Sequence, residues 1–425
     1  MAMTSRERVQ RAINHLPTDR VPVDLGGTSC SCIHAKEVYP IREALGLPPV
    51  VPEVIDPMMF ISTPEEDMRQ ALGVDCVGIY TKGTLFGYRN ENYKSWNLPD
   101  GTEVKMGGGF QCTYGEDGSV YAYPEGDLTA APSARMTKTG FYFDNIVRQE
   151  DLDAKEIWDG REDYKDQYSV FTDQDIKDIK EQVDYYWNHT EYSMIGNYWN
   201  GGIGDNLHFP GAWLKNPKGV RNIPDFFMYM NLEPDYFLEA FDMITDITLK
   251  NLEIYNQIAG DKIDVMVHTG TDFAHQHGLL ISNAKYNELF APFHKKVNDW
   301  IHTHTNWKTF MHCCGSVVNL LPDIIRAGFD IINPVQVSAD NMDPRVLKDK
   351  FGKDIVFWGG GCDPQHVMPQ GTPEEVYEQT RKNAAIFSEN GGFVGGHVHN
   401  LQYGVPAENF LAEIKALKDT VPQAK

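Results

Sequence analysis

The chain has 425 residues, and 41% of them are hydrophobic, so it can bury a large core. Its 38 basic and 60 acidic side chains give a formal net charge of −22 at pH 7. This charge disfavours nucleic acid and anionic membranes as partners, because binding a polyanion requires clustered Lys and Arg. The amphipathic stretch from Met1 to Asn14 lacks the apolar core of a signal peptide, and no run of about 18 apolar residues occurs. We therefore expect a cytoplasmic protein.

The cysteines and histidines indicate where the chemistry lies. The seven cysteines are odd in number and widely spread, which is not typical of a disulfide framework, so we expect thiols and a metal site. Ten of the 14 histidines fall between residues 268 and 399. The functional site is therefore expected in the C-terminal half of the chain.

The N-terminal segment begins with a capping box, in which Thr4 is followed three residues later by Glu7. It predicts a short helix that ends near His15 to Pro17. A strand is expected at Val21 to Leu25, followed by a tight polar loop, Gly26-Gly27-Thr28-Ser29.

The sequence pattern of residues 86–150 is typical of an antiparallel β insertion. Asp-Gly turns at Leu98-Pro99-Asp100-Gly101 and Glu116-Asp117-Gly118-Ser119 separate short β-prone runs, which is typical of hairpins. We expect a β-rich elaboration within a single domain that spans residues 1–425.

Helices and strands alternate through the rest of the chain. Repeated strand–helix–strand units predict a parallel sheet. The expected strands are Tyr192 to Tyr198, Ile263 to Val267, Lys308 to Met311, Phe329 to Ile332, Ile355 to Trp358 and Phe393 to Val394. The expected helices are Asp173 to Trp187, Asp235 to Ile258, Asn283 to Thr303, Val317 to Ala327, Pro344 to Lys350, Pro373 to Asn390 and Ala407 to Lys418.

Each of the last five strands is followed by a polar, metal-capable or glycine-rich loop. These loops begin at His268, His312, Asn333, Gly359 and Gly395. A (β/α)₈ barrel gathers such loops at the C-terminal face of its strands, where its site is built. A doubly wound open sheet concentrates binding near one switch point, so it fits this pattern less well. We therefore predict an α/β protein with a distorted (β/α)₈ barrel.

His312 and Cys314 give the sharpest chemical signal. Side chains two residues apart on a strand point to the same side, and an imidazole with a thiolate suits zinc. The alternative is a buried cysteine beside a hydrogen-bonded barrel histidine. His397, His399 and Cys362 are the further ligand candidates, because three protein ligands and an open fourth position make a catalytic zinc site.

Oxygen and amide side chains at the same edge are candidates for binding. Asp272 and Gln276 could supply an oxygen ligand, orient the histidine ring or cap the next helix. Asn333, Gln336, Asn400 and Gln402 suit a neutral polar group of a substrate, although loop stabilisation is an equal alternative.

Several motifs together resemble the uroporphyrinogen decarboxylase (URO-D) superfamily, in its cobalamin-dependent methyltransferase-like branch. The resemblance covers the first 30 residues and nearly everything from about residue 230 onward. The motifs are Thr4-Ser5-Arg6-Glu7-Arg8-Val9, Asp19-Arg20-Val21-Pro22-Val23, His312-Cys313-Cys314-Gly315-Ser316, Asn333-Pro334-Val335-Gln336, Phe357-Trp358-Gly359-Gly360-Gly361, Gly371-Thr372-Pro373-Glu374-Glu375-Val376, His399-Asn400-Leu401-Gln402 and Val405-Pro406-Ala407-Glu408-Asn409.

The resemblance implies a distorted barrel with a funnel-shaped site at the strand C-termini. Its zinc motif is His-x-Cys followed much later by Cys; His312 and Cys314 match the first part. The later Cys has no counterpart, so a histidine, preferably His399, would replace it. The decarboxylase itself has an Arg-rich N-terminal loop that binds porphyrin carboxylates, whereas residues 24–32 of this chain contain no Arg.

The resulting hypothesis is a zinc-dependent corrinoid methyltransferase. It would move a methyl group between a corrinoid (methylcobalamin), presented by a corrinoid carrier protein, and a small methyl donor or a thiol or folate acceptor. His312, Cys314 and His399 would hold zinc, which would activate a thiol or polarise a leaving heteroatom. Asp272 and His312 would be the catalytic residues, with Gln276, Asn333, Gln336, Asn400 and Gln402 as substrate-binding residues.

Three other functions remain open at this point. They are a metal-free decarboxylase like uroporphyrinogen decarboxylase, a metal-dependent hydrolase or lyase that acts on a small polar substrate, and a non-catalytic binding protein. A homodimer is the default expectation for the oligomeric state.

Overall fold

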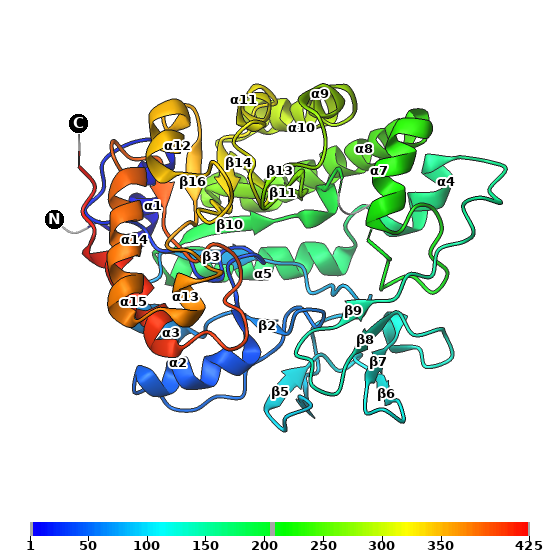
Figure 1. The fold of residues 1–425 in the computed structure, drawn as a ribbon, viewed down its shortest axis with the longest axis horizontal. Helices are drawn as coiled ribbons and strands as arrows, with labels where there is room; N and C mark the ends of the chain where they lie inside the picture. Colours follow the sequence, from blue (N-terminus) through cyan, green and yellow to red (C-terminus); the bar gives the residue numbers. More distant parts are fainter. Residues whose placement is uncertain (1–2, 205–208, 424–425) are drawn as a thin grey trace.

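A curled parallel sheet of seven strands forms the centre of the molecule (Figure 1). The computed structural model describes residues 3–204 and 209–423. The strand order is β17-β16-β15-β14-β11-β10-β3, and every neighbouring pair is parallel. The strands are β3 (Cys76–Ile79), β10 (Ser193–Asn197), β11 (Val265–Gly270), β14 (Lys308–His312), β15 (Ile331–Asn333), β16 (Val356–Trp358) and β17 (Phe393–Val394).

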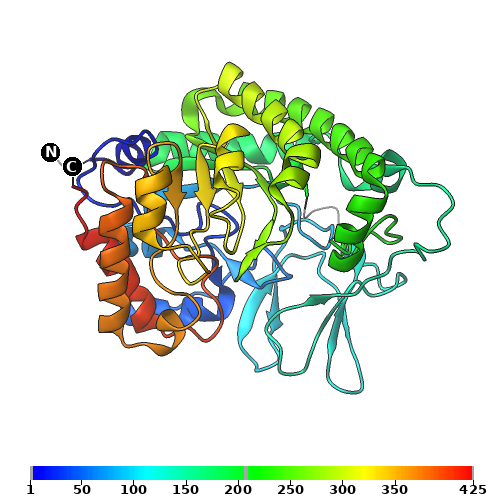
Figure 2. The same cartoon turned by 45° about the horizontal axis from the view of Figure 1, so that its top comes forward.

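Helices surround this sheet on its outer face, as the turned view shows (Figure 2). Buried side chains of the helices and the outward side of the strands form the largest apolar cluster. The helices are α1 (Ser5–Ile13), α2 (Val38–Ala44), α3 (Glu66–Leu72), α4 (Gly160–Tyr164), α5 (Asp173–His189), α7 (Ile223–Leu232), α8 (Pro234–Ala259), α9 (Asn283–Leu289), α10 (Ala291–His304), α11 (Leu321–Arg326), α12 (Pro344–Phe351), α13 (Val367–Gln370), α14 (Pro373–Phe387) and α15 (Ala407–Asp419).

The segment from Val21 to Leu25 closes the sheet into a barrel. Asp24 N–H donates to Gly395 O and Gly395 N–H donates to Pro22 O, both at 2.8 Å, beside β17. On the other side, Asp75 N–H donates to Val23 O at 2.8 Å, just before β3. The segment therefore lies between the two edge strands, in the place of an eighth strand.

The barrel interior is filled with apolar side chains from alternate strand positions. Ile195, Val265, Phe310, Val356 and their neighbours form one cluster with three residues of α1. This helix packs against β10, β17 and β3, and it begins with the predicted capping box at Thr4 and Glu7. The barrel is thus a packed core, and polar chemistry is confined to its strand ends.

The predicted fold class, a distorted (β/α)₈ barrel with an antiparallel elaboration, is confirmed, with three local differences. The predicted strand at Val21 to Leu25 makes only an isolated bridge between Val23 and Gly395. The predicted helix from Asn283 to Thr303 is two helices that meet at Phe290, and Pro292 lies in the first turn of the second one. Strand β11 runs on to Gly270, so His268 lies within the strand and not in the loop after it.

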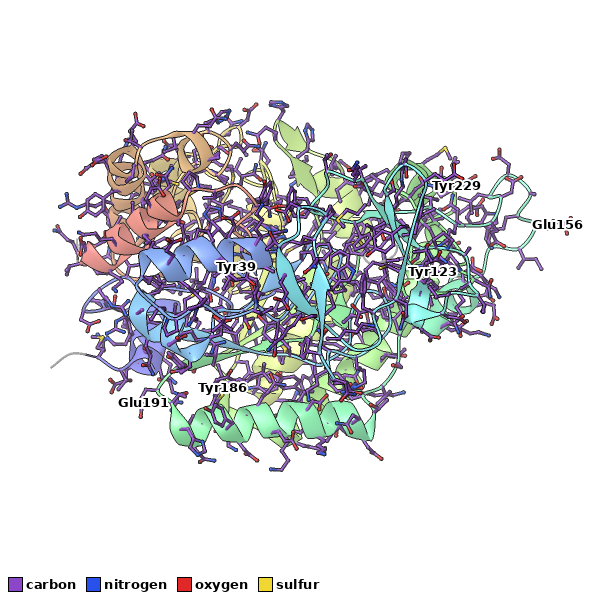
Figure 3. All side chains as sticks on the ribbon, turned by 90° about the horizontal axis from the view of Figure 1, so that it is seen from below. Tyr39, Tyr123, Glu156, Tyr186, Glu191 and Tyr229 are labelled. Atoms are coloured by element: carbon purple, nitrogen blue, oxygen red, sulfur yellow. The ribbon has the colours of Figure 1, made fainter. Side chains whose placement is uncertain are left out.

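The antiparallel strands lie inside the segment 86–150, with the predicted Asp-Gly turns between them. They form a two-stranded sheet and a four-stranded sheet over a separate apolar cluster. Tyr39 of α2 donates to Glu103 O at 2.9 Å and so ties the insertion to the barrel (Figure 3). These strands are β4 (Lys94–Asn97), β5 (Glu103–Met106), β6 (Cys112–Tyr114), β7 (Val120–Ala122), β8 (Ala134–Met136) and β9 (Asp144–Asn145).

Two short antiparallel pairs complete the described strands. They are β1 (Ile33–His34) with β2 (Ile61–Ser62), and β12 (Ala274–His275) with β13 (Gly278–Leu279). Among the described residues, no helix is both long enough and apolar enough to cross a lipid bilayer.

The buried carboxylate of Asp75 stabilises the barrel closure. It accepts hydrogen bonds from Arg8 and Arg20 at 2.7 Å and from Val23 N–H at 2.8 Å, and its side chain is fully buried. We expect Asp75→Ala to lower the free energy of unfolding by about 3–5 kcal/mol, because it removes the buried carboxylate that pairs with the guanidinium groups of Arg8 and Arg20.

Urea unfolding followed by circular dichroism measures this loss. Asp299→Ala is the matched control, because the pair between Lys295 and Asp299 is exposed, and such pairs contribute about 1 kcal/mol or less. Equal losses in the two variants would contradict the role given to Asp75.

Candidate functional site

The imidazole of His312 stands at the end of β14 in a fixed orientation. Its Nδ1–H donates to Asn333 Oδ1 at 2.8 Å, and Asn333 Nδ2 donates to Trp358 O at 3.1 Å. Because an amide oxygen can only accept, Nδ1 bears a proton, and in the neutral ring Nε2 carries the lone pair. The hydrogen bonds thus present Nε2 of His312 as a ligand atom.

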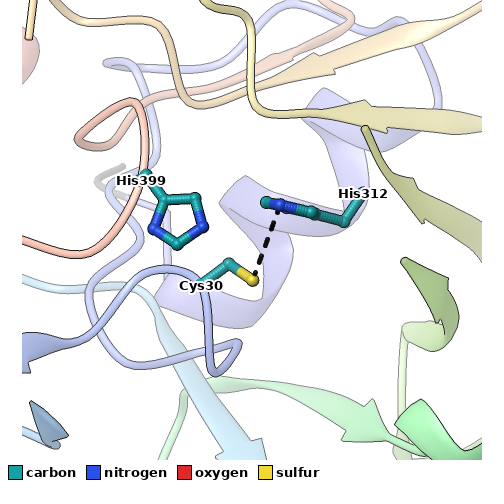
Figure 4. Close-up of side chains that lie close together, drawn as sticks. All are labelled: Cys30, His312 and His399. Carbon is teal, nitrogen blue, oxygen red and sulfur yellow. Dashed lines mark hydrogen bonds between the residues drawn. The ribbon is translucent and has the colours of Figure 1, made fainter. Parts of the chain in front are cut away.

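Two cysteine sulfurs face this nitrogen. Cys314 Sγ lies 3.3 Å from His312 Nε2, and Cys30 Sγ lies 3.9 Å from it. The ring of His399 lies beside Cys30 and His312, with its centroid 5.1 Å from that of His312 (Figure 4). Among the described residues, two groups with metal-binding spacing share His312: one with Cys30 and His399, the other with Asp272 and Cys314.

The charges in this cluster favour a thiolate beside an imidazolium. Burial raises the pKa of the Cys30 thiol, but His312 and His399 outweigh burial and lower that pKa to about 6. Burial disfavours the charged ring of His312, but Cys30 and Cys314 raise its pKa above the usual range. Burial raises the pKa of Cys314 to about 11, against the opposing effect of His312. The site is therefore suited to hold a cation in place of the imidazole proton.

Polar side chains hold the loops around the cluster. Asp272 Oδ1 accepts from Cys314 N–H at 2.7 Å. Gln336 Oε1 accepts from Gly315 N–H at 2.9 Å, and its Nε2 donates to Gln276 Oε1 at 2.8 Å. The two glutamines thus join the loops that follow β11, β14 and β15.

An indole ring forms one wall of the site. The ring of Trp199 lies edge-on to that of His312, with centroids 6.0 Å apart, and its Nε1 donates to Asn197 Oδ1 at 3.3 Å. Gly270 allows this approach, since a Cβ there would lie 2.6 Å from the indole. The wall is therefore apolar and held in place.

The two histidines after β17 have different surroundings. His397 Nδ1 pairs with the buried Glu413 of α15 at 3.0 Å, whereas His399 lies in the cluster. Strand β17 ends at Val394, so the alternation that would place both rings on one side does not extend to them. Cys362 is buried and in contact with Asp363 O, and burial raises its pKa.

The predicted amides of the last loop also lie beside the cluster. Asn400 Oδ1 accepts from Cys32 N–H at 2.8 Å, and its buried Nδ2 has no hydrogen-bond partner among the described residues. The exposed Gln402 donates to Asn400 O at 3.1 Å. The structure therefore brings His312, Cys314, Asp272 and His399 together, with Asn333, Gln276, Gln336, Asn400 and Gln402 around them.

Sequence reasoning missed Cys30 as a member of the site. The only hint was that Cys30 lies in the loop after the first predicted strand, Val21 to Leu25, and such loops build the site of a barrel. Asp56 was also missed: burial and the nearby Cys30 raise its pKa to about 6, although Met58 and Met59 N–H groups lower it. No motif of the sequence points to Asp56.

The fold and the site define a barrel protein with a thiol–imidazole centre at the C-terminal ends of its strands. Residues 215–423 match the family described as Uroporphyrinogen decarboxylase (URO-D). The chain is 31% identical over 141 residues to methylated-thiol–coenzyme M methyltransferase of Methanosarcina mazei. That match covers 33% of this chain and 35% of the relative, so it spans about a third of the relative's length.

A solved structure shows the same fold. A methyltransferase from Methanosarcina mazei has a TM-score of 0.53 at 16% identity, with 98% of both chains covered. A 3-keto-D-glucoside 4-epimerase from E. coli has a TM-score of 0.34 at 10% identity, over 61% of this chain and 86% of the epimerase. The predicted resemblance to the uroporphyrinogen decarboxylase superfamily, in its methyltransferase-like branch, is confirmed for the C-terminal part of the chain.

Two of the ten histidines between residues 268 and 399 are buried and belong to neither group with metal-binding spacing. His268 Nε2 is hydrogen-bonded to Asn298 Oδ1 at 2.7 Å, and burial lowers its pKa to about 4. Burial lowers the pKa of His294 to about 3. Both rings stay neutral in the folded chain at a pH where the unfolded chain takes up protons.

Stability should therefore fall on acidification. The contribution of His268 is fully present above its unfolded pKa of about 6.5 and is lost as the pH falls from there towards 4, with about 2 kcal/mol lost by pH 5. Urea unfolding at pH 7 and pH 5 measures the change. His268→Gln should reduce the loss of unfolding free energy between pH 7 and pH 5 by about 2 kcal/mol. His304→Gln, at an exposed position, should leave this loss unchanged. An unaltered pH dependence in His268→Gln would be inconsistent with this account.

Proposed function

We propose that this chain is a zinc-dependent methyltransferase that exchanges a methyl group between a corrinoid on a carrier protein and a small donor or a thiol or folate acceptor. The observation that carries the proposal is the fixed Nε2 of His312 beside the Cys314 sulfur. The similarity to a methyltransferase that acts on methylated thiols and coenzyme M supports the same class of reaction.

The residues of the site fit zinc. Ligand distances of about 2.3 Å to sulfur and 2.0–2.1 Å to nitrogen, at a tetrahedral angle, place the two ligand atoms about 3.6 Å apart. The observed separation between His312 Nε2 and Cys314 Sγ is 3.3 Å. A third ligand would come from the neighbouring Cys30 or His399, with Asp272 within reach of the same centre.

When bound, zinc would lower the pKa of a thiol substrate so that it reacts as the thiolate, or polarise the heteroatom of a methyl donor. Transfer to a thiol would form a carbon–sulfur bond with the electron pair of the thiolate. The carbon–cobalt bond would break with its pair left on cobalt, and the thiol proton would be released.

The surrounding residues would position the ligands and the substrate. Asn333 fixes the ring of His312, and Asp272 fixes the backbone of Cys314. The unpaired Nδ2 of Asn400 is a donor for a polar group of the substrate, and Trp199 supplies an apolar wall. Gln276 and Gln336 would position the substrate through the loops that they join, and Gln402 would do so within the last loop. The carrier protein would cover the site at the strand ends.

Cys314→Ser should remove zinc and turnover together, because it deletes a sulfur ligand. Elemental analysis of untagged protein should find about one zinc per chain in the wild type and almost none in the variant. Cys112→Ser, in strand β6 of the insertion, is the control and should keep the metal. Full zinc content and full activity in Cys314→Ser would refute the assignment.

The second test concerns the ring of His312. Asn333→Ala removes the acceptor that holds Nδ1–H, so zinc affinity should fall by about 10–100-fold. Asn333→Asp keeps that acceptor and should retain most of the affinity. Competition with a chromophoric chelator measures both values. Equal affinities in the two variants would argue against the role of this hydrogen bond.

The reaction itself is tested with methylcobalamin and a panel of thiols and folates. The zinc-loaded protein should demethylate the corrinoid, which is followed by its visible spectrum, whereas Cys314→Ser should not. A zinc-loaded chain that is inactive with every acceptor and methyl donor, or a metal-free chain that decarboxylates uroporphyrinogen, would overturn the proposal.

A further inference from the structure

We propose that Cys30, from the N-terminal loop, and not His399, is the third protein ligand beside His312 and Cys314. This inference rests on the proposed function, in that the site holds zinc. It concerns only which residue completes the ligand set. The two candidates lie on loops from opposite ends of the chain, and both face His312.

The hydrogen bonds of His399 make its ring a poor ligand. Its Nδ1 accepts from Asn400 N–H at 2.7 Å, so that nitrogen carries no proton. The proton of the neutral ring therefore lies on Nε2. In the neutral ring of His399, Nδ1 thus accepts a hydrogen bond and Nε2 bears the proton. In His312 the reverse holds, since Nδ1 donates and Nε2 is free to bind.

Cys30 has the spacing to His312 that a shared metal requires. The sulfurs of Cys30 and Cys314 belong to separate groups with metal-binding spacing, so a bound metal would draw them together. The sulfur of Cys30 lies 3.9 Å from His312 Nε2, and that of Cys314 lies 3.3 Å from the same atom. Tetrahedral zinc places such a pair about 3.6 Å apart, so both sulfurs deviate from this value by about 0.3 Å in opposite directions. Two thiolates and one imidazole also satisfy the preference of zinc for sulfur and nitrogen.

The loop that carries Cys30 is held in this conformation by its own hydrogen bonds. Gly26 N–H donates to Ser31 O at 2.6 Å, and Cys30 N–H donates to Thr28 Oγ1 at 3.2 Å. Cys32 N–H donates to Asn400 Oδ1 at 2.8 Å and anchors the loop beside His399. The sulfur of Cys30 is therefore held facing His312.

These contacts leave His399 as a positioning residue. Its Nε2–H lies in the same group as Cys30 and is suited to donate a hydrogen bond to the sulfur of Cys30. A hydrogen bond to a ligating atom orients it and tunes its affinity for the metal. We therefore expect a change at His399 to weaken the site and a change at Cys30 to remove a ligand.

Zinc X-ray absorption of the wild-type protein distinguishes the two ligand sets without any substitution. Bonds to sulfur near 2.3 Å and to nitrogen or oxygen near 2.0–2.1 Å are separable. The inference requires two sulfur ligands per zinc. One sulfur per zinc would overturn it and leave the proposed function intact, whereas the absence of zinc binding would overturn both.

Substitutions then identify the second sulfur. With cobalt(II) in place of zinc, the sulfur-to-metal absorption per bound ion should fall to about half in Cys30→Ser, because one of two thiolates is lost. His399→Gln should keep the full absorption, with zinc affinity lowered by about 10–100-fold. Cys32→Ser is the matched control in the same loop, since its buried thiol donates to Thr28 O at 3.3 Å and lies outside the ligand groups.

The opposite result is equally clear. Unchanged absorption in Cys30→Ser, together with loss of the metal in His399→Gln, would assign the ligand to His399. Thermal unfolding of the metal-free variants checks that each one folds as the metal-free wild type does.

Discussion

Two sets of hydrogen bonds around residues 21–25 determine how this molecule is organised. The segment joins β17 on one side and the start of β3 on the other, and the carboxylate of Asp75 holds it there through Arg8, Arg20 and Val23 N–H. This closure brings the first loop of the chain beside the last one. A site shared by Cys30, His312 and His399 exists only because the sheet closes.

Much of this architecture could be predicted from the sequence, because it depends on local patterns. The alternation of strands and helices predicted the barrel, and the Asp-Gly turns predicted the antiparallel insertion. His312 and Cys314 were identifiable because they follow a strand at a two-residue spacing. The break at Phe290 was missed, since a helical pattern continues across it and only Pro292 marks the second helix.

The composition of the site was less predictable, because it depends on contacts between distant residues. Cys30 and His312 are 282 residues apart in sequence, and no local pattern relates them. His397 and His399 have the same spacing as His312 and Cys314, but their strand has already ended. The pairing of His397 with Glu413 of α15 depends on packing, which a single sequence does not reveal.

The insertion has an apolar core of its own, separate from the core of the barrel. It also lies beside the last loop, where Phe141 stacks on Tyr403 and the hydroxyl of Tyr142 accepts from Tyr403 N–H. Substitutions on its surface can therefore accumulate during evolution with little effect on the strands that carry the thiols. Related chains could in this way differ in the surface beside the thiol–imidazole site. They would then bind different substrates while the site itself is retained.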